Sequence, residues 1–302
     1  MELLAQNILN GVTIGAFYAL VALGYTMVYG VLKLINFAHG DLFMWGSYLG
    51  YTGLMVLLGL GLRGGPWMII PVVIAAMLII ALAGVLLERS AYRPLRHAGR
   101  LPPIISALGA AFVLESLARN VYGATYITYP SAISLTGGIR LIGDVRASTM
   151  QILALVVSFA MMAGLWAFVN FTRTGTAMRA VSLDHDTSRL MGIDVNRIIT
   201  VVFLIGPGLG AVAGILVALY YGSFDFTMGM TFGLKAFIAA ILGGIGNIPG
   251  AMLGGMILGI VESLGAGYIS PQWKDVIAYA MLALTLIVRP TGLLGERVAE
   301  KL

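Results

Sequence analysis

The sequence predicts an all-α polytopic membrane protein, because it is too apolar and too poorly charged to fold in water. Of its 302 residues, 59% are hydrophobic and only 10% are charged, whereas soluble domains typically carry about 25% charged residues. A lipid bilayer accepts such an apolar exterior when the backbone is helical. The 40 glycines fit the same class, since small residues inside apolar segments let membrane helices pack closely.

Apolar runs of about 20 residues, the length that spans a bilayer as a helix, follow one another along the chain. The last third departs from this length, with a shorter pair of runs at 233–246 and 250–266. The pair is either two thin spans or a re-entrant hairpin, so we expect about 8–9 membrane segments. No linker divides the chain, and residues 1–302 should form a single transmembrane domain. The other predicted spans lie at about 6–31, 42–61, 67–87, 104–121, 149–170, 198–221 and 273–289.

The loop charges predict which way the chain crosses the membrane. Most Lys and Arg residues lie in segments 88–100 and 171–197 and in the tail from residue 289. Positively charged loops stay in the cytoplasm, which predicts an external N-terminus and a cytoplasmic C-terminus. The same placement accounts for the net charge of +5 without a nucleic-acid partner. No positive region precedes the first apolar run, so we expect it to be a retained span rather than a cleaved signal peptide.

The apolar character breaks near residues 33–41, within the run LINFAHGD. Asn36, His39 and Asp41 cluster there, and the backbone is expected to be broken or re-entrant. Irregular backbone at membrane depth is tolerated where it lines a cavity or is buried in protein, and transporters place substrate sites at broken helices. The three residues therefore either line a translocation pathway or belong to an ordinary interfacial loop, and spacing alone favours neither.

The predicted cytoplasmic loop 173–197 is short, of mixed charge and ordered in appearance. Asp184 or Asp186 is expected to cap a helix that runs to Met191 and ends at Gly192. Leu183 and Leu190 belong to an apolar patch among charged neighbours, which suits docking on another protein. The alternative is a helix lying on lipid headgroups, but the acidic residues disfavour contact with an anionic leaflet. The candidate docking residues are Arg179, Asp184, Asp186, Arg189, Leu190, Met191, Gly192 and Ile193.

Two further regions have weaker signals. The predicted external loop 122–148 is rich in turn and β-branched residues and should form a turn-rich or hairpin segment. It either touches an external partner or simply caps the bundle. The stretch 232–264 repeats glycine at four-residue spacing, as in Gly255 and Gly259, which permits close helix packing. Gly246 and Gly250 would share a helix face only if Pro249 did not interrupt the helix.

Two acidic residues lie inside predicted spans, where facing lipid would be costly. Glu115 either lines the pathway or pairs with Arg119, four residues further along the same helix. Glu262 has no local partner and is also a pathway candidate. His97 and His185 fall in the predicted cytoplasmic loops and should be solvated.

Motifs for catalysis are absent from the sequence. It contains no G-x-x-x-x-G-K-[ST] loop for nucleotide phosphates, no H-E-x-x-H zinc motif and no G-x-S-x-G nucleophile elbow. There are no cysteines, so thiolate metal sites are excluded. We therefore expect a protein that is not an enzyme and that binds no cofactor or metal itself.

Several stretches together resemble one known family. The run NGVTIGAFYALVALGYTMVYGVLKLINFAHGD, the loop GTAMRAVSLDHDTSRLMGIDVNR and the stretch GLKAFIAAILGGIGNIPGAMLGGMILGIVES are similar to the permease subunits of branched-chain amino acid ABC importers, the LivH type. The likeness runs in order from about Asn10 to Gly292. In that family Gly192 would take the place of a recurrent glycine in the coupling segment.

The resemblance implies a pore-forming permease domain in the bacterial cytoplasmic (inner) membrane, surrounded by membrane lipid. A second permease subunit would complete a heterodimer, two cytoplasmic ATPase subunits would bind ATP and Mg, and a periplasmic amino-acid-binding protein would deliver the substrate. The 173–197 loop would then dock on an ATPase. One rival is a stand-alone secondary transporter or channel for a small polar solute, which would recruit Asp41, Glu115 and Glu262. Another is a purely structural scaffold, which the break near 33–41 disfavours.

Overall fold

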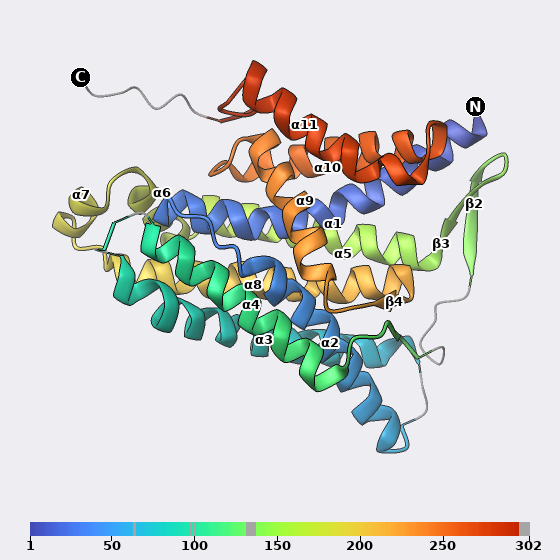
Figure 1. The fold of residues 1–302 in the computed structure, drawn as a ribbon, viewed down its shortest axis with the longest axis horizontal. Coiled ribbons are helices and arrows are strands. Elements are labelled where there is room, and N and C mark those ends of the chain that lie inside the picture. The colour runs from blue at the N-terminus through green and yellow to red at the C-terminus, as the bar shows by residue number, and fades with distance from the viewer. Residues whose placement is uncertain (63–64, 97, 100, 131–136, 296–302) are drawn as a thin grey trace.

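The computed structural model describes residues 1–62, 65–96, 98–99, 101–130 and 137–295 as a bundle of long helices (Figure 1). His97, Arg100 and part of the predicted external loop 122–148, residues 131–136, lie outside the described residues. Seven helices within these ranges are long and apolar enough to cross a membrane. They are α1 (Glu2–Leu32), α2 (His39–Gly59), α3 (Ile69–Leu87, continued by irregular helical turns to Leu95), α4 (Leu101–Tyr122), α5 (Thr149–Phe171), α8 (Val195–Tyr221) and α10 (Ile248–Tyr268).

The predicted short pair at 233–246 and 250–266 has two unequal members. Helix α9 (Met228–Gly243) has 16 residues and is shorter than a span, whereas α10 has 21 residues and reaches spanning length. The prediction of two short segments is therefore wrong for the second. Pro249 lies in the first turn of α10, where its missing N–H breaks no hydrogen bond, so the helix continues through it. The last helix, α11 (Lys274–Val288), has 15 residues.

Helix α1 lies at the centre of the bundle and touches α10 through glycines. A Cβ atom built on Gly15 would lie 2.9 Å from the Cα of Met256, and one built on Gly255 would lie 2.5 Å from the backbone nitrogen of Ala19. Gly259 likewise meets the backbone of Gly15. The predicted role of these glycines in close helix packing is confirmed. Gly246 lies before α10 at φ 99°, so it does not share a helix face with Gly250.

The break between the first two helices is shorter than expected. Helix α1 ends at Leu32, and Lys33 adopts a left-handed conformation with φ 55°. Helix α2 already begins at His39. The expected broken region of 33–41 is therefore corrected to 33–38, because His39 and Asp41 lie in the first helical turn. Figure 1 shows α2 and α9 both beginning in the middle of the molecule rather than at one of its ends.

The molecule has two distinct ends (Figure 1). The hairpin end carries the N-terminus and the antiparallel strands β2 (Gly138–Ile142) and β3 (Val145–Ser148), which confirm the predicted hairpin in loop 122–148. There β1 (Ile127–Thr128) also pairs with β4 (Ser223–Phe224). The opposite end, called the α7 end, carries the short helices α6 (Arg173–Leu183) and α7 (His185–Leu190).

We predict that Gly255→Leu destabilises the protein, because even the first carbon of the new side chain would collide with the backbone of Ala19. Overpacking of this kind costs about 1–3 kcal/mol or more. The matched control is Gly164→Leu, since Gly164 lies in a helix with nothing within 4 Å of its Cβ position. Thermal unfolding of the detergent-solubilised chain should show a lower midpoint for the first variant only. Equal midpoints would contradict the α1–α10 contact.

Candidate functional site

The break between α1 and α2 is buried and held by hydrogen bonds. The side chain of Asn36 is 1% exposed and accepts a hydrogen bond from the hydroxyl of Tyr92 at 2.8 Å. The ring of His39 is fully buried and packs edge-on against Tyr25, with ring centroids 4.9 Å apart. It occupies the space that a side chain at Gly24 would need. Asn36 and His39 therefore lie inside the helix packing of this chain rather than on an open surface.

The N-terminal turns of α2 and α9 touch each other directly. A Cβ atom on Gly40 would lie 3.0 Å from the Cα of Gly233 and would collide with the carbonyl oxygen of Gly229. A Cβ atom on Gly229 would lie 2.8 Å from the Oδ1 atom of Asp41. Helix N-termini carry partial positive charge, so the Asp41 carboxylate lies where two such ends meet. Its side chain is 5% exposed.

Glu115 on α4 is partly buried and lies within electrostatic range of Asp41. The predicted pair of Glu115 with Arg119 does not form among the described residues. Instead, the guanidinium carbon of Arg119 lies 5.7 Å from the centre of the Phe226 ring, in the segment that leads into α9. A cation over an aromatic face is attracted by the ring quadrupole. For Arg119 this attraction competes with the weak ion pair to Glu115 that the helix spacing allows.

Glu262 has a partner that sequence spacing does not reveal. Its Oε1 atom lies 2.9 Å from the Nζ atom of Lys235 on α9, and its Oε2 atom accepts a hydrogen bond from Tyr18 at 2.9 Å. Lys235 also lies 2.8 Å from the Oδ1 atom of Asp275 on α11. The buried network joins α1, α9, α10 and α11, and it satisfies the Glu262 carboxylate within this chain. This arrangement gives Glu262 a structural role.

At the α7 end, each turn of the 173–197 loop is fixed by local hydrogen bonds. The Oδ1 atom of Asp184 accepts from the backbone N–H groups of Asp186 and Thr187 at 2.8 and 3.2 Å, which confirms the predicted helix cap. Gly192 has φ 82°, and the N–H of Ile193 donates to the carbonyl of Ser188 at 3.0 Å. This is the pattern of a helix ended by a left-handed glycine, as predicted.

The short helices present apolar side chains to the outside. Leu183 is 82% exposed, Leu190 88% and Met191 77%, whereas Ile193 is partly buried against the core. Arg189 forms an ion pair with Asp186, at 3.1 Å on the same exposed surface. Single exposed apolar residues are common in proteins. Leu183 ends α6, and Leu190 and Met191 end α7, so this capped segment exposes three apolar side chains among charged neighbours.

His185 ties this element to the central helix. Its Nε2 atom lies 2.6 Å from the carbonyl oxygen of Val31, in the last turn of α1. The expectation of a solvated histidine is therefore wrong, because a carbonyl left without an intrahelical partner at a helix end accepts its N–H. The partner is 154 residues away in sequence, and no local pattern could have indicated it.

A small cavity of about 60 Å³ lies beside α6. It runs between Thr26 and Gly30 on α1, Arg179 and Ser182 on α6, and the residues just before α10. A cavity of this size holds a few water molecules. Arg179, one of the predicted docking residues, thus borders the cavity and donates a hydrogen bond to Asn170 at 2.9 Å.

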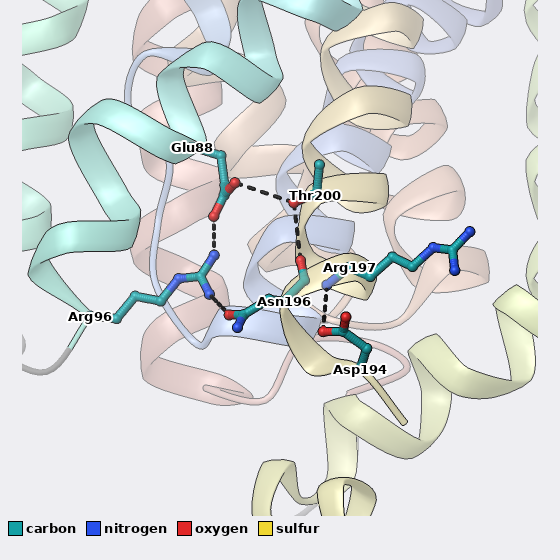
Figure 2. Close-up of polar contacts among 6 residues, drawn as sticks. All are labelled: Glu88, Arg96, Asp194, Asn196, Arg197 and Thr200. Carbon is teal, nitrogen blue, oxygen red and sulfur yellow. Dashed lines mark hydrogen bonds and ion pairs between the residues drawn. The ribbon is translucent and has the colours of Figure 1, made fainter. Parts of the chain in front are cut away.

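A second polar cluster fixes the start of α8, the helix that follows the 173–197 loop (Figure 2). The carboxylate of Glu88 is fully buried and forms an ion pair with Arg96, and it accepts a hydrogen bond from Thr200 at 3.3 Å. Arg96 also donates to the side chain of Asn196 at 2.8 Å. Partial burial lowers the pKa of Arg96, and the neighbouring Glu88 opposes this shift.

This cluster was missed by sequence analysis, in which Arg96 counted only as one of the loop cations and Glu88 was given no role. Their partners on α8 lie about 100 residues further along the chain. A local signal does mark the place, since Glu88–Tyr92 forms a π-helical turn, an irregularity frequent at functional sites. The turn allows Tyr92 to reach Asn36 while Glu88 reaches Thr200.

Comparison with known proteins decides the family. Residues 7–286 match the family described as "Branched-chain amino acid transport system / permease component". This chain belongs to that family. It is 43% identical to the high-affinity branched-chain amino acid transport system permease protein BraD of Pseudomonas aeruginosa, over 98% of this chain and 97% of the relative. It is 42% identical to LivH of Escherichia coli K12 over the same shares, and 28% identical to a probable LivH of Methanocaldococcus jannaschii over 91% and 88%.

Family membership confirms the resemblance that the sequence motifs indicated. The relatives are transport permeases, which supports a non-catalytic role. Permease components act within transport systems, so partner subunits are implied. The seven long apolar helices fit a protein of the membrane.

We predict that Lys235→Met destabilises the protein by about 3–5 kcal/mol, because it leaves the buried Glu262 carboxylate unpaired. The double variant with Glu262→Gln should recover most of this loss, since the carboxylate that needed a cation is gone. Lys274→Met is the control, because Lys274 carries no ion pair among the described residues. Thermal unfolding in detergent measures all three. A Lys235→Met variant as stable as the control would contradict the network.

Proposed function

We propose that the chain is the pore-forming permease subunit of an ATP-driven importer for branched-chain or related amino acids. Family membership supports the transport of amino acids, and the missing phosphate-binding loop supports energy supply from separate ATPase subunits, which would bind ATP and Mg. The α7 end is proposed to face the cytoplasm, with the C-terminus, and the hairpin end to face the periplasm. This orientation follows the charge of the connecting loops in a bacterial inner membrane.

The observation that carries the coupling proposal is the exposed patch of Leu183, Leu190 and Met191. An ATPase subunit that changes shape on binding ATP can move the membrane subunit only if the element on which it docks is rigid. Asp184 and Gly192 fix both ends of α7, and His185 joins it to α1. A movement imposed on the patch would therefore reach the membrane helices rather than bend a loose loop.

The remaining partners follow from the same assignment. A second permease subunit would complete the pore as a heterodimer, and a periplasmic amino-acid-binding protein would dock at the hairpin end. Of the five predicted pathway residues, Asp41 and Glu115 stay candidates, because Asp41 lies where α2 and α9 begin and Glu115 on α4 is within electrostatic range of it. Asn36 and His39 pack inside the chain, and Glu262 belongs to the buried network with Lys235.

We predict that the double variant Leu190→Asp, Met191→Asp abolishes stable association with the ATPase subunits and reduces ATP-driven uptake at least tenfold. Two charges would be placed in the core of an interface, where charged residues are depleted. Co-purification with tagged ATPase and uptake into proteoliposomes measure the two effects. Leu60→Asp is the control, because Leu60 is 73% exposed just after α2, on a connection outside the docking patch. Normal assembly and uptake in the double variant would refute docking at α7.

A further inference from the structure

We propose that the first part of α8, residues 195–206, and the segment 88–96 that follows α3 move as one unit, which pivots at Pro207. Glu88 and Arg96 are the positioning residues that join the two segments. The inference deepens the proposed function and rests on it, because the ATPase subunits would supply the movement through α7. The two segments together are called the α3–α8 unit.

Among the described residues, three side-chain pairs join the two segments. In order along α8 they are Asn196 with Arg96, Thr200 with Glu88, and Phe203 with Tyr92. The partners on α8 are four and three residues apart, which places them on one face of the helix. Figure 2 shows the two polar pairs at the start of α8. The buried Glu88 carboxylate also pairs with Arg96, so the 88–96 segment is itself held together where it meets α8.

Helix α8 is weakened directly beyond this face. Pro207 lies inside the helix, and its ring nitrogen cannot donate the hydrogen bond that the carbonyl oxygen of Phe203 would otherwise accept. Gly206 and Gly208 flank the proline, and glycine inside a helix has a high cost in backbone entropy. Sharp bends of helices occur mainly at such residues. Residues 206–208 are therefore the place where α8 bends most easily.

Two neighbouring helices meet α8 at this point through glycine. A Cβ atom on Gly206 would lie 3.4 Å from the Cα of Gly24 on α1, and one on Gly84 of α3 would lie 2.6 Å from the Cγ atom of Pro207. Neither contact interlocks two long side chains. A small rotation of the helix about these contacts therefore separates no packed side-chain pair there, and they can serve as its fulcrum.

Beyond Pro207, α8 packs closely on α2. A Cβ atom on Gly46 of α2 would lie 2.6 Å from the carbonyl oxygen of Ala211, and one on Gly214 would lie 3.0 Å from the hydroxyl of Ser47. The three pairs with the 88–96 segment all precede the proline. The second part of α8 is thus anchored on α2, while the first part is joined to the segment that follows α3.

A cavity gives the first part of α8 room to move. Val202 borders the cavity of about 60 Å³ beside α6, with Thr26 and Gly30 of α1 and Ser182 of α6 on its other walls. Protein interiors are otherwise close-packed, so a helix moves most easily toward a space that other atoms do not fill. The α3–α8 unit can therefore shift toward α6 at this level.

The exposed patch reaches the unit through a short connection. Helix α7 ends at Leu190, and Asp194 already caps α8 by accepting a hydrogen bond from the N–H of Arg197 at 3.1 Å (Figure 2). Between them, the N–H of Ile193 donates to the carbonyl of Ser188 at 3.0 Å, which folds the connection back on α7. A movement of α7 is therefore passed to the first turn of α8.

Removing the two hydrogen bonds to α8 tests the unit without leaving a buried charge unpaired. The double variant Asn196→Ala, Thr200→Val keeps the ion pair of Glu88 with Arg96. We expect the importer in proteoliposomes to hydrolyse roughly threefold or more ATP per leucine taken up, because α7 then moves without the 88–96 segment. A mere loss of folded complex would lower both rates and leave their ratio unchanged. Thr285→Val is the control, since Thr285, like Thr200, bonds the carbonyl four residues earlier but lies on α11.

Distances between pairs of spin labels test the pivot, since the chain has no cysteine of its own. The importer would be compared without nucleotide and with ATP and vanadate. Labels at Ser90→Cys and Arg197→Cys, both within the unit, should keep their separation. Labels at Ser90→Cys and Leu253→Cys on α10 should change theirs, and Pro207→Ala should reduce this change by roughly half or more, because it restores the helical hydrogen bond. Pro249→Ala is the matched control, because Pro249 lies in the first turn of α10.

Each of the following results would overturn the inference. The ratio of ATP to leucine is unchanged in the double variant, the separation within the unit changes, the separation from α10 stays constant, or Pro207→Ala responds like the unmodified importer. Failure of the unmodified importer to take up leucine with ATP would instead refute the proposed function itself. Normal uptake together with any of the other results would refute the α3–α8 unit alone.

Discussion

The close approach of α1 and α10 is the constraint on which the other arrangements depend. Glycines at Gly15, Gly255 and Gly259 let the two backbones touch, and without that contact α1 could not lie buried at the centre of the bundle. Close packing of small residues replaces the hydrophobic effect, which does not drive helix association inside lipid. The Tyr18 hydroxyl on α1 then reaches Glu262 on α10, so the Lys235 network depends on the same contact.

Because α1 is central, both ends of the molecule are bonded to it. At the hairpin end, the side chain of Gln6 exchanges two hydrogen bonds with the backbone of Arg146 on β3, at 3.0 and 3.1 Å. At the α7 end, the carbonyl of Val31 meets His185. Between them, Tyr25 packs on His39, where α2 begins. One helix of 31 residues thus contacts the hairpin, the start of α2 and the 173–197 loop.

Structural features that depend on residues close together in the sequence were predicted correctly. Apolar runs placed the helices, Asp184 and Gly192 marked the ends of α7, and the turn residues of loop 122–148 marked a hairpin. Interactions between distant segments could not be predicted. Lys235 and Glu262 are 27 residues apart and His185 and Val31 are 154 apart, and no periodicity links such pairs. The Glu115–Arg119 pair, one of the two alternatives for Glu115, is absent among the described residues for the same reason, because Arg119 lies over Phe226, from a distant segment.

The proposal that most needs a test is that this chain would import amino acids only as part of an ATP-driven complex, with its α7 end toward the ATPases. The most direct measurement is uptake of radiolabelled leucine into proteoliposomes that contain the purified importer, with ATP inside and the binding protein outside. The account predicts uptake that needs both and that stops when either is omitted. Accumulation of leucine by this chain alone, driven by an ion gradient without ATP or ATPase subunits, would contradict it.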